Sequence, residues 1–563
     1  MAAKRLGEQY PSELRREARV KRRRYGISRA AGLVAVLAGL LFAAMAAAAE
    51  EPLPILARVG PWPVVSELIG FRGRLWLVNS VKSVNHNSAD LYSYDPKTAE
   101  LSYERHLFSQ DAGRPLVADG LLYWPFEDAR ASLGVGHFMV TDGERWRLGT
   151  IPSAQIFHSH AMVASDRGLI AATSAWRAGL QLSLDRGRSW RQVYDHPTPE
   201  RRVTRIVRLA ALGDLTFGYV IGNGQMRLLL DGARVTEVPG WPADQPIVGL
   251  SAFAGHLYGI VLEARGAAVW RTDGKVSERV SPPRANWAVD DLAAGADSLW
   301  ALAASGNGGA VWHSPDGVAW EGRYRLKGGR PYELAVHRGA VYVGGAGDDG
   351  RGVLWGLPRP PGAAPALPRA GMPPWPATDT TERDWTAAGR DLDRLLADPA
   401  SYLPAGRPLR DLVLELALAD PPAGFFSERL AWPFPTEDLS LIGGNVRVPA
   451  AKMARWILLW GMSLAGRGEV PLALLEEPWT APPNPSEKYF EAPPAAMWTA
   501  ALVGQDDPAT IEALIGRLER KGDPLWLRGD ALGALVAVTG QRFGYDAAAW
   551  RRWWQQAKQA SRE

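Results

Sequence analysis

The chain has 563 residues, enough for two to four domains, and its 47% hydrophobic and 22% charged residues exclude global disorder. It contains no cysteine, so disulfides, cysteine–zinc sites and thiol nucleophiles are excluded. The net charge of +4 comes from the leader, because residues 1–29 hold ten Lys or Arg against three Glu. Residues 50–563 are therefore slightly acidic, and we expect no nucleic-acid partner.

Residues 1–49 have the pattern of a signal peptide or an N-terminal membrane anchor. The basic segment precedes "AAGLVAVLAGLLFAAMAAAA" (30–49), which is uncharged and ends in an Ala-x-Ala pattern typical of cleavage sites. Twenty such residues would also just span a bilayer, with the basic flank in the cytoplasm. Both alternatives stay open. Either one predicts an exported body, in the bacterial periplasm or anchored to the inner membrane and facing the periplasm.

Residues 50–357 contain an internal repeat. Short hydrophobic strands such as "GRLWLVN" and "GLLYWPF" start at 73, 120, 168, 213, 255, 297 and 339, at intervals of 42 to 48 residues. A second series in step with the first places aspartates in turns at 95, 142, 185, 231, 273 and 316. Four short strands per repeat are typical of a propeller blade. The pattern predicts a seven-bladed β-propeller, with residues 54–60 adding the outer strand that the seventh blade lacks.

The rest of the chain is predicted to be helical. Residues 358–378 are rich in proline, which predicts a semi-rigid linker. Beyond the linker, in residues 379–563, the hydrophobic period changes from 2 to 3.6 and indicates helices at 381–398, 407–418, 447–464, 493–503, 508–520, 524–538 and 545–560. The last part, with "TGQRFGYD" before a Trp-rich helix, resembles HEAT-like α-repeat segments of bacterial proteins. The predicted fold class is thus multidomain β + α: a seven-bladed β-propeller followed by a HEAT-like helical domain.

One turn carries a family resemblance. "SLDRGRSW" (183–190) resembles the Asp-box, or BNR, motif of the sialidase superfamily, and "SPDGVAW" (314–320) is a shortened version. We interpret both as structural turns on the outer rim, in which Ser and Asp bond the backbone, Gly permits the turn and Trp packs beneath it. The residues concerned are Ser183, Asp185, Gly187, Trp190, Ser314, Asp316, Gly317 and Trp320. Sialidases share an early Arg-Ile-Pro element, and this sequence has none.

A ligand site is expected at the opposite end of the blades, at the mouth of the axial channel. The loops there are rich in polar and aromatic residues, and His158 and His160, two residues apart, share one side of a strand. The candidate ligand-binding residues are Asn85, His86, Asn87, Glu127, Asp128, His158, His160, Trp176, Arg177 and His196. Trp241 and Trp287 lie in neighbouring loops and could stack on a ligand ring.

The same residues leave the chemistry open. No cofactor is predicted; His158 and His160 with nearby carboxylates could hold a divalent metal such as zinc, or could line a wet channel. No catalytic residue is identified. The leading hypothesis is an exported scaffold that binds a protein or carbohydrate ligand at the propeller face, with the helical domain as a second interaction surface. The alternative is an envelope hydrolase, or another enzyme, acting on a carbohydrate or other polar substrate at the channel mouth.

Overall fold

The computed structural model describes most of residues 50–560. The described ranges are 50–81, 89–129, 135–152, 156, 158–175, 177–197, 203–222, 226–231, 234–242, 245–263, 266–280, 288–358, 386–406, 408–419, 421–422, 424–441, 446–481 and 490–560. The predicted leader, nearly all of the predicted linker, and the candidate residues Asn85, His86, Asn87, Trp176 and Trp287 lie outside these ranges.

The strands follow one another as antiparallel meanders. The first three consist of β3 (Val64–Phe71), β4 (Arg74–Ser80), β5 (Asp90–Asp95) and β6 (Glu100–His106); of β7 (Ser109–Ala112), β8 (Leu116–Ala118), β9 (Leu121–Ala129), β10 (Gly136–Thr141) and β11 (Trp146–Ile151); and of β12 (His158–Ser165), β13 (Gly168–Ser174), β14 (Ala178–Ser183) and β15 (Arg191–Asp195). In the second meander, β7 and β8 both pair with β9, so its innermost strand is split in two.

The remaining meanders repeat the pattern. They consist of β16 (Thr204–Leu212), β17 (Leu215–Gly222), β18 (Met226–Asp231) and β19 (Arg234–Glu237); of β20 (Ile247–Phe253), β21 (His256–Glu263), β22 (Gly266–Thr272) and β23 (Ser277–Val280); of β24 (Ala288–Ala294), β25 (Leu299–Ser305), β26 (Gly308–Ser314) and β27 (Glu321–Lys327); and of β28 (Gly329–His337), β29 (Ala340–Gly347) and β30 (Gly352–Gly356). Alternating small and branched apolar residues along these strands fill the cores between neighbouring meanders.

The N-terminal strands complete the outer edges of the last two meanders. β2 (Ile55–Val59) pairs antiparallel with β30, which is the place predicted for residues 54–60. β1 (Glu51–Pro52), which the sequence did not indicate, adds to β27 in parallel. The described chain therefore begins on the same sheets with which its strand region ends, so both outer edges are covered.

The C-terminal region is helical, as the sequence predicts. Its helices are α2 (Thr386–Ala397), α3 (Pro399–Ala405), α4 (Leu409–Leu418), α5 (Phe425–Leu430), α6 (Ala450–Ala465), α7 (Leu472–Glu476), α8 (Ala492–Val503), α9 (Pro508–Glu519), α10 (Leu525–Thr539) and α11 (Ala547–Ala560). A hairpin of β31 (Asp438–Leu441) and β32 (Val446–Pro449) interrupts them. None of these helices is long and apolar enough to cross a membrane.

Local sequence explains the helix ends. Asp507 caps α9 by accepting hydrogen bonds from the N–H groups of Ala509 and Thr510, and Pro508 follows at the first helical position. Gly540 ends α10 in the left-handed conformation. In α11, Trp550 and Trp554 are buried, and Trp554 Nε1 donates to Glu512 of α9 over 2.7 Å. The Trp stripe of the last helix thus docks it on its neighbours.

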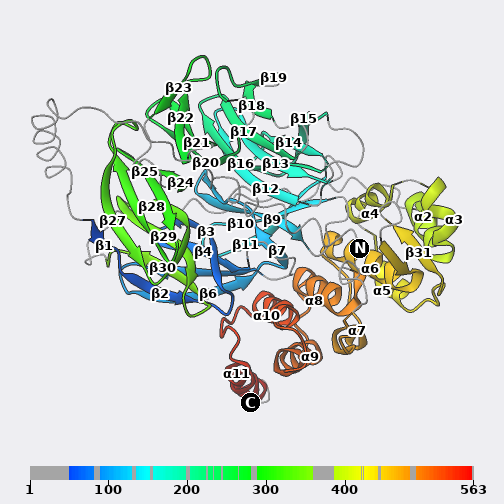
Figure 1. The fold of residues 1–563 in the computed structure, drawn as a ribbon. Coiled ribbons are helices and arrows are strands. Elements are labelled where there is room, and N and C mark those ends of the chain that lie inside the picture. Colours follow the sequence, from blue (N-terminus) through cyan, green and yellow to red (C-terminus); the bar gives the residue numbers. More distant parts are fainter. Residues whose placement is uncertain are drawn as a thin grey trace, which may run out of the picture.

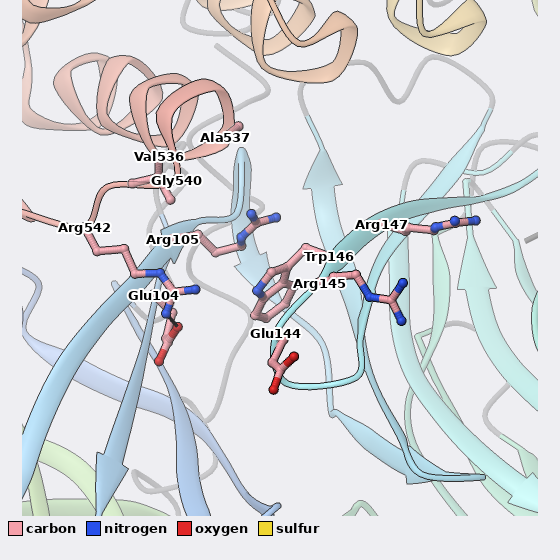
Figure 2. A pocket seen from close by; sticks show the side chains of 10 residues that line it. All are labelled: Glu104, Arg105, Glu144, Arg145, Trp146, Arg147, Val536, Ala537, Gly540 and Arg542. Atoms are coloured by element: carbon pink, nitrogen blue, oxygen red, sulfur yellow. Dashed lines mark hydrogen bonds and ion pairs between the residues drawn. The ribbon is translucent and has the colours of Figure 1, made fainter. Parts of the chain in front are cut away.

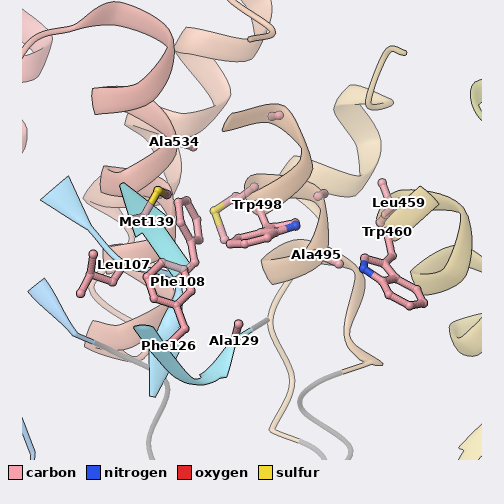
Figure 3. Close-up of a cluster of buried hydrophobic side chains, with 14 of the residues drawn as sticks. Leu107, Phe108, Phe126, Ala129, Met139, Leu459, Trp460, Ala495, Trp498 and Ala534 are labelled. Atoms are coloured by element: carbon pink, nitrogen blue, oxygen red, sulfur yellow. The ribbon is translucent and has the colours of Figure 1, made fainter. Parts of the chain in front are cut away.

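The helical region packs against the first and second meanders (Figure 1). One buried hydrophobic cluster runs from the strands into the helices without interruption. Phe108, between β6 and β7, meets Trp498 of α8 edge to face, with ring centroids 5.4 Å apart (Figure 3). The two parts of the chain therefore share a core.

A buried polar group crosses the same boundary. His106 of β6 lies between two carboxylates, with Nδ1 2.9 Å from Asp90 and Nε2 3.0 Å from Asp530 of α10, and all three side chains are fully buried. Burial alone lowers the pKa of His106, but the hydrogen bonds to Asp530 and Asp90 outweigh it and raise this pKa. We call Asp90, His106 and Asp530 the interdomain triad. Because the three side chains are fully buried, the triad connects the strands to the helices and is not accessible to a substrate.

Candidate ligand-binding site at the propeller axis

Each innermost strand has an irregularity at the same level. The antiparallel pairing of β3, β12, β16, β20, β24 and β28 with the next strand shifts register two to four residues after the strand begins. A bulge at this point turns a side chain out of the regular alternation. The residues at this level are Glu67, His160, Arg208, Gly249, Asp291 and Glu333, and Arg114, between β7 and β8, takes the same place in the second meander. We call these seven residues the axial belt.

The charged residues of the belt pair across the ring. Arg114 Nη1 lies 3.2 Å from Asp291 and 3.5 Å from Glu333. Arg208 lies 3.3 Å from Glu67 and 3.0 Å from Glu333. These bonds join the second meander to the sixth and seventh, and the fourth to the first and seventh. Because these meanders are not neighbours, their innermost strands must converge on one axis, and the ion pairs bridge it.

Burial and charge set the ionisation of the belt. Burial lowers the pKa of Arg208, but Glu333 and Glu67 more than compensate, so the net shift is upward. Burial raises the pKa of Asp291, and Arg114 and Arg208 reverse this effect only in part. The backbone N–H of Leu334 donates to Asp291 over 3.0 Å. Both guanidinium groups are therefore favoured in their charged form and bind carboxylates across the axis.

Arg114 depends on the glycine before it. A Cβ added at Gly113 would lie 2.2 Å from the carbonyl oxygen of His160, so only glycine allows the second meander to approach the third this closely. The N–H of Arg114 then donates to the same carbonyl over 2.9 Å. Gly113 thus places the Arg114 side chain at the axis.

The structure brings part of the predicted site together beside the belt. His158 Nδ1 lies 2.9 Å from Asp128, and His158 pairs through its backbone with Glu127 of β9. The rings of His158 and His160 stack with centroids 5.2 Å apart. Asp128 has a positive φ of 54°, a strained conformation for a residue with a side chain. A carboxylate behind an imidazole is the arrangement that orients a general base.

His160 itself is held neutral. Burial lowers its pKa well below the usual value, and His158 and Arg205 lower it further. Its Nε2 lies 3.0 Å from Ser174 Oγ. No group of three His, Asp or Glu residues that could hold a metal ion occurs in the described part of the chain. The metal at His158 and His160 stays a prediction.

The other predicted residues form a second group at the outer side of the third meander. Arg177 lies 2.9 Å from Asp195, and His196 Nδ1 shares a hydrogen bond of 2.6 Å with Tyr194 Oη. Burial and, to a smaller extent, the negative charge of Asp195 raise the pKa of Tyr194 to about 12. The Tyr194 hydroxyl therefore keeps its proton at neutral pH. Arg177 is half exposed and directly precedes β14, at the end of that strand away from Leu184.

Trp241 is not a ligand-stacking residue. Its ring is buried and packs against Phe217, with centroids 4.8 Å apart, inside a hydrophobic core. The prediction that it could stack on a ligand is wrong, because the chain folds the loop inward to fill space between the fourth and fifth meanders.

The two Asp-box-like turns lie at the far end of their meanders. Asp185 accepts hydrogen bonds from Ser183 Oγ, at 2.8 Å, and from the N–H groups of Arg188 and Ser189. Asp316 accepts in the same way from Ser314 and from the N–H groups of Val318 and Ala319. Gly187 and Gly317 have the positive φ that such turns need, and Trp190 and Trp320 follow them. These side chains serve the turn and are turned away from the axis.

Sequence reasoning missed most of the axial belt, although a signal for it exists. The seven positions recur at intervals of 41 to 48 residues, as the strand series does, and five of them directly precede a buried leucine. At four of the seven positions a charged residue stands directly before a buried leucine, and this combination marks an axis-facing position: Glu67, Arg208, Asp291 and Glu333. Only His160 was singled out, because its partner His158 lies so close in sequence.

Comparisons with known proteins add little to this picture. No family model and no curated protein matches the sequence. Among solved structures, Sqt1 of Saccharomyces cerevisiae gives a TM-score of 0.33 at 10% identity, over 55% of this chain and 100% of that chain. YCF48 from Cyanidioschyzon merolae gives 0.36 at 13% identity, over 53% and 97%. A prolyl endopeptidase gives 0.37 at 11% identity, over 52% and 50%. These low scores carry no inference about what this chain binds.

Proposed function

We propose that the chain is an exported scaffold, built as a closed seven-bladed propeller with Asp-box turns and a HEAT-like helical domain. In this proposal it binds a protein or carbohydrate ligand on the loops above the axial belt. The observation that carries the proposal is the set of ion pairs from Arg114 and Arg208 to carboxylates of non-neighbouring meanders. These ion pairs support a closed ring of blades, in which the loops above the axial belt would hold the ligand.

The helical domain provides a second surface in this scheme. The interdomain triad and the shared hydrophobic core support a rigid connection between the two parts. Rigid attachment keeps two binding surfaces at a fixed spacing, so an ordered partner can meet both without the entropic cost of domain motion.

Export is part of the proposal and rests on the leader. Residues 1–29 are basic and residues 30–49 are apolar, as in signal peptides and anchors. The mass of the N-terminal fragment after expression in a bacterial host separates the two forms: cleavage near residue 49 gives a soluble periplasmic protein, and an intact leader gives a membrane-bound one.

One observation favours the alternative of an enzyme. The contact of 2.9 Å between His158 and Asp128 is that of an oriented base, and His158 lies next to the axis. An enzyme of this kind would act on a carbohydrate or another polar substrate. Turnover of chromogenic glycosides or esters by the purified protein, lost in His158→Ala and kept in His256→Ala on a remote turn, would replace the scaffold proposal.

The scaffold proposal is tested by site-specific photo-crosslinking in the source cell. A benzophenone amino acid at Arg177, at the loop end of β14, is expected to trap a discrete partner or glycan. The matched control is Leu184, at the other end of the same strand and 69% exposed, which is expected to trap none. Equal trapping at both positions, or trapping at Leu184 alone, contradicts a binding face at the mouth.

A further inference from the structure

A cavity of about 410 Å³ lies where the helical region meets the first two meanders. Its walls come from β6, from the turn between β10 and β11, and from the C-terminal end of α10 (Figure 2). Four arginines line it against two glutamates: Arg105, Arg145, Arg147 and Arg542 with Glu104 and Glu144. The cavity is therefore cationic, in a part of the chain that is slightly acidic as a whole.

Two of the arginines already have carboxylate partners. Arg542 Nη1 lies 2.5 Å from Glu104, which also accepts a hydrogen bond from Ser93. Arg145 holds Asp142 through Nε and Nη2, at 3.1 and 2.9 Å. These pairs fix the cavity walls and neutralise the charges of Arg542 and Arg145.

Arg105 differs from both. Its guanidinium carbon lies 4.5 Å from the centroid of the Trp146 ring, and its Nη1 lies 3.8 Å from the sulfur of Met139. Within the described part of the chain, its buried Nε has no hydrogen-bond partner. Burial lowers the pKa of Arg105 to about 10, and the like charge of Arg542 contributes. A partly buried guanidinium whose Nε donor is unsatisfied is costly, and the oxygens of an oxyanion would accept hydrogen bonds from its planar set of donors.

We propose that this cavity binds a small organic anion, whose carboxylate or phosphate oxygens accept hydrogen bonds from Arg105. The volume exceeds what a bare oxyanion fills, so the ligand carries an organic body that reaches toward Val536 and Ala537 at the end of α10. The site is remote from the channel mouth and does not depend on the proposed scaffold function.

Ligand binding here has a structural consequence. The cavity is walled by both parts of the chain, so a ligand that fills it contacts β6 and α10 together and stabilises their docking. Binding of the anion is therefore expected to raise the melting temperature of the whole molecule.

The test uses the full-length protein and isothermal titration calorimetry at constant ionic strength. Inorganic phosphate and succinate are the two probes, because they separate a phosphate ligand from a carboxylate ligand. We expect one of them to bind with about 1:1 stoichiometry and to raise the melting temperature. Arg105→Met is expected to weaken binding ~10-fold or more, the loss of a charge-assisted hydrogen bond.

Two further variants serve as controls for the calorimetry. Arg279→Met removes an exposed arginine that lies outside the cavity, 3.1 Å from Glu263, and binding is expected to stay within about threefold of the wild type. Arg105→Lys keeps the charge and loses the planar fork, so it is expected to fold and to bind more weakly than the wild type. The proposal is overturned if neither probe binds, or if Arg105→Met and Arg279→Met weaken binding equally, which would indicate general charge attraction.

Discussion

At the scale of single residues, Arg114 and Arg208 of the axial belt contribute to stability because each binds two buried carboxylates. Arg208 sits between Glu67 and Glu333, whose side chains are almost fully buried. Removing one partner of a buried ion pair leaves the other charge without compensation, which costs more than the pair itself contributes. The belt is therefore a point where one substitution acts on several meanders at once.

The variant Arg208→Met tests this role. It removes the ion pairs of Arg208 with Glu67 and Glu333, while Glu333 keeps Arg114 at 3.5 Å, so we expect the free energy of unfolding to fall by about 3 kcal/mol. Urea denaturation at pH 7 measures it. The control Arg279→Met removes an exposed arginine 3.1 Å from Glu263 and is expected to cost at most ~1 kcal/mol. Equal losses in the two variants would show that the axis is open to water.

At the scale of the elements, the turn between β14 and β15 is a local structure that needs its aspartate. Hydrogen bonds from Ser189, Ser183 and Arg188 outweigh the opposing effect of burial and hold the pKa of Asp185 below its usual value. Its ionised form is thus favoured by folding. The turn lies at the far end of β14 from Arg177, so its loss should leave the proposed binding face intact.

The variant Asp185→Ala is expected to lower the free energy of unfolding by ~1–2 kcal/mol, as for loss of a capping side chain. Because the folded pKa is depressed, the contribution of Asp185 is present above the unfolded pKa and disappears as the pH falls through the folded one. The difference between wild type and variant should therefore be constant from pH 7 to 5 and shrink below about pH 4. Crosslinking at Arg177 should not change; loss of crosslinking would assign the turn a part in binding.

At the scale of the whole molecule, the interdomain triad joins the sheets to the helices through hydrogen bonds from His106 to Asp90 and Asp530. Tyr545 Oη and Trp62 Nε1 each donate to Asp90 over 2.8 Å, so the triad is enclosed by further donors. A Cβ added at Gly533 of α10 would lie 2.9 Å from His106 and Phe108, so this glycine is what lets the helix come close enough. Hydrogen bonds to Asp530 and Asp90 raise the pKa of His106 against the opposing effect of burial, which favours the form that carries a positive charge between the two carboxylates.

The variant His106→Gln tests the joint. It leaves Asp90 and Asp530 facing each other without a cation, so we expect a loss of ~3–5 kcal/mol and two separate transitions in calorimetry. Because the folded pKa is raised, the His106 contribution is complete below the unfolded pKa of about 6.5 and is lost as the pH rises through the folded value. The deficit of the variant should therefore be larger at pH 6 than at pH 9.

The control for that measurement is His256→Gln, since His256 bonds only a carbonyl of its own turn, that of Ala254. We expect its melting temperature to follow that of the wild type at both pH values. A pH-independent deficit in His106→Gln would mean that His106 is neutral in the fold and acts only as a hydrogen-bond donor and acceptor.

Much of the fold could be predicted because its signals are local. Each of the seven predicted helical ranges overlaps an observed helix, and the predicted strand starts from 73 to 339 each lie within about two residues of an observed strand start. Apolar periodicity, Asp and Pro at helix starts and Gly at helix ends act within one or two turns of chain. The hairpin of β31 and β32 and the short helices α3, α5 and α7 were missed, since such brief elements carry little periodicity.

The site was predictable only in part. The sequence placed His158 and His160 on one side of a strand, and their rings do stack. It could not pair His158 with Asp128, which lies in another meander, nor reveal that Trp241 fills a core. It also gave no reason to join His106 to Asp530, which is 424 residues away.

The sequence by itself determined the repeat, the change from strands to helices and the turns that Asp185 and Asp316 close, because each depends on neighbours along the chain. The tertiary structure alone decided which charges meet: Arg114 with Asp291 across the axis, and His106 with Asp530 across the joint. The physical reason is that the energy of a buried charge depends on its nearest partner in space, and ring closure and helix docking choose that partner.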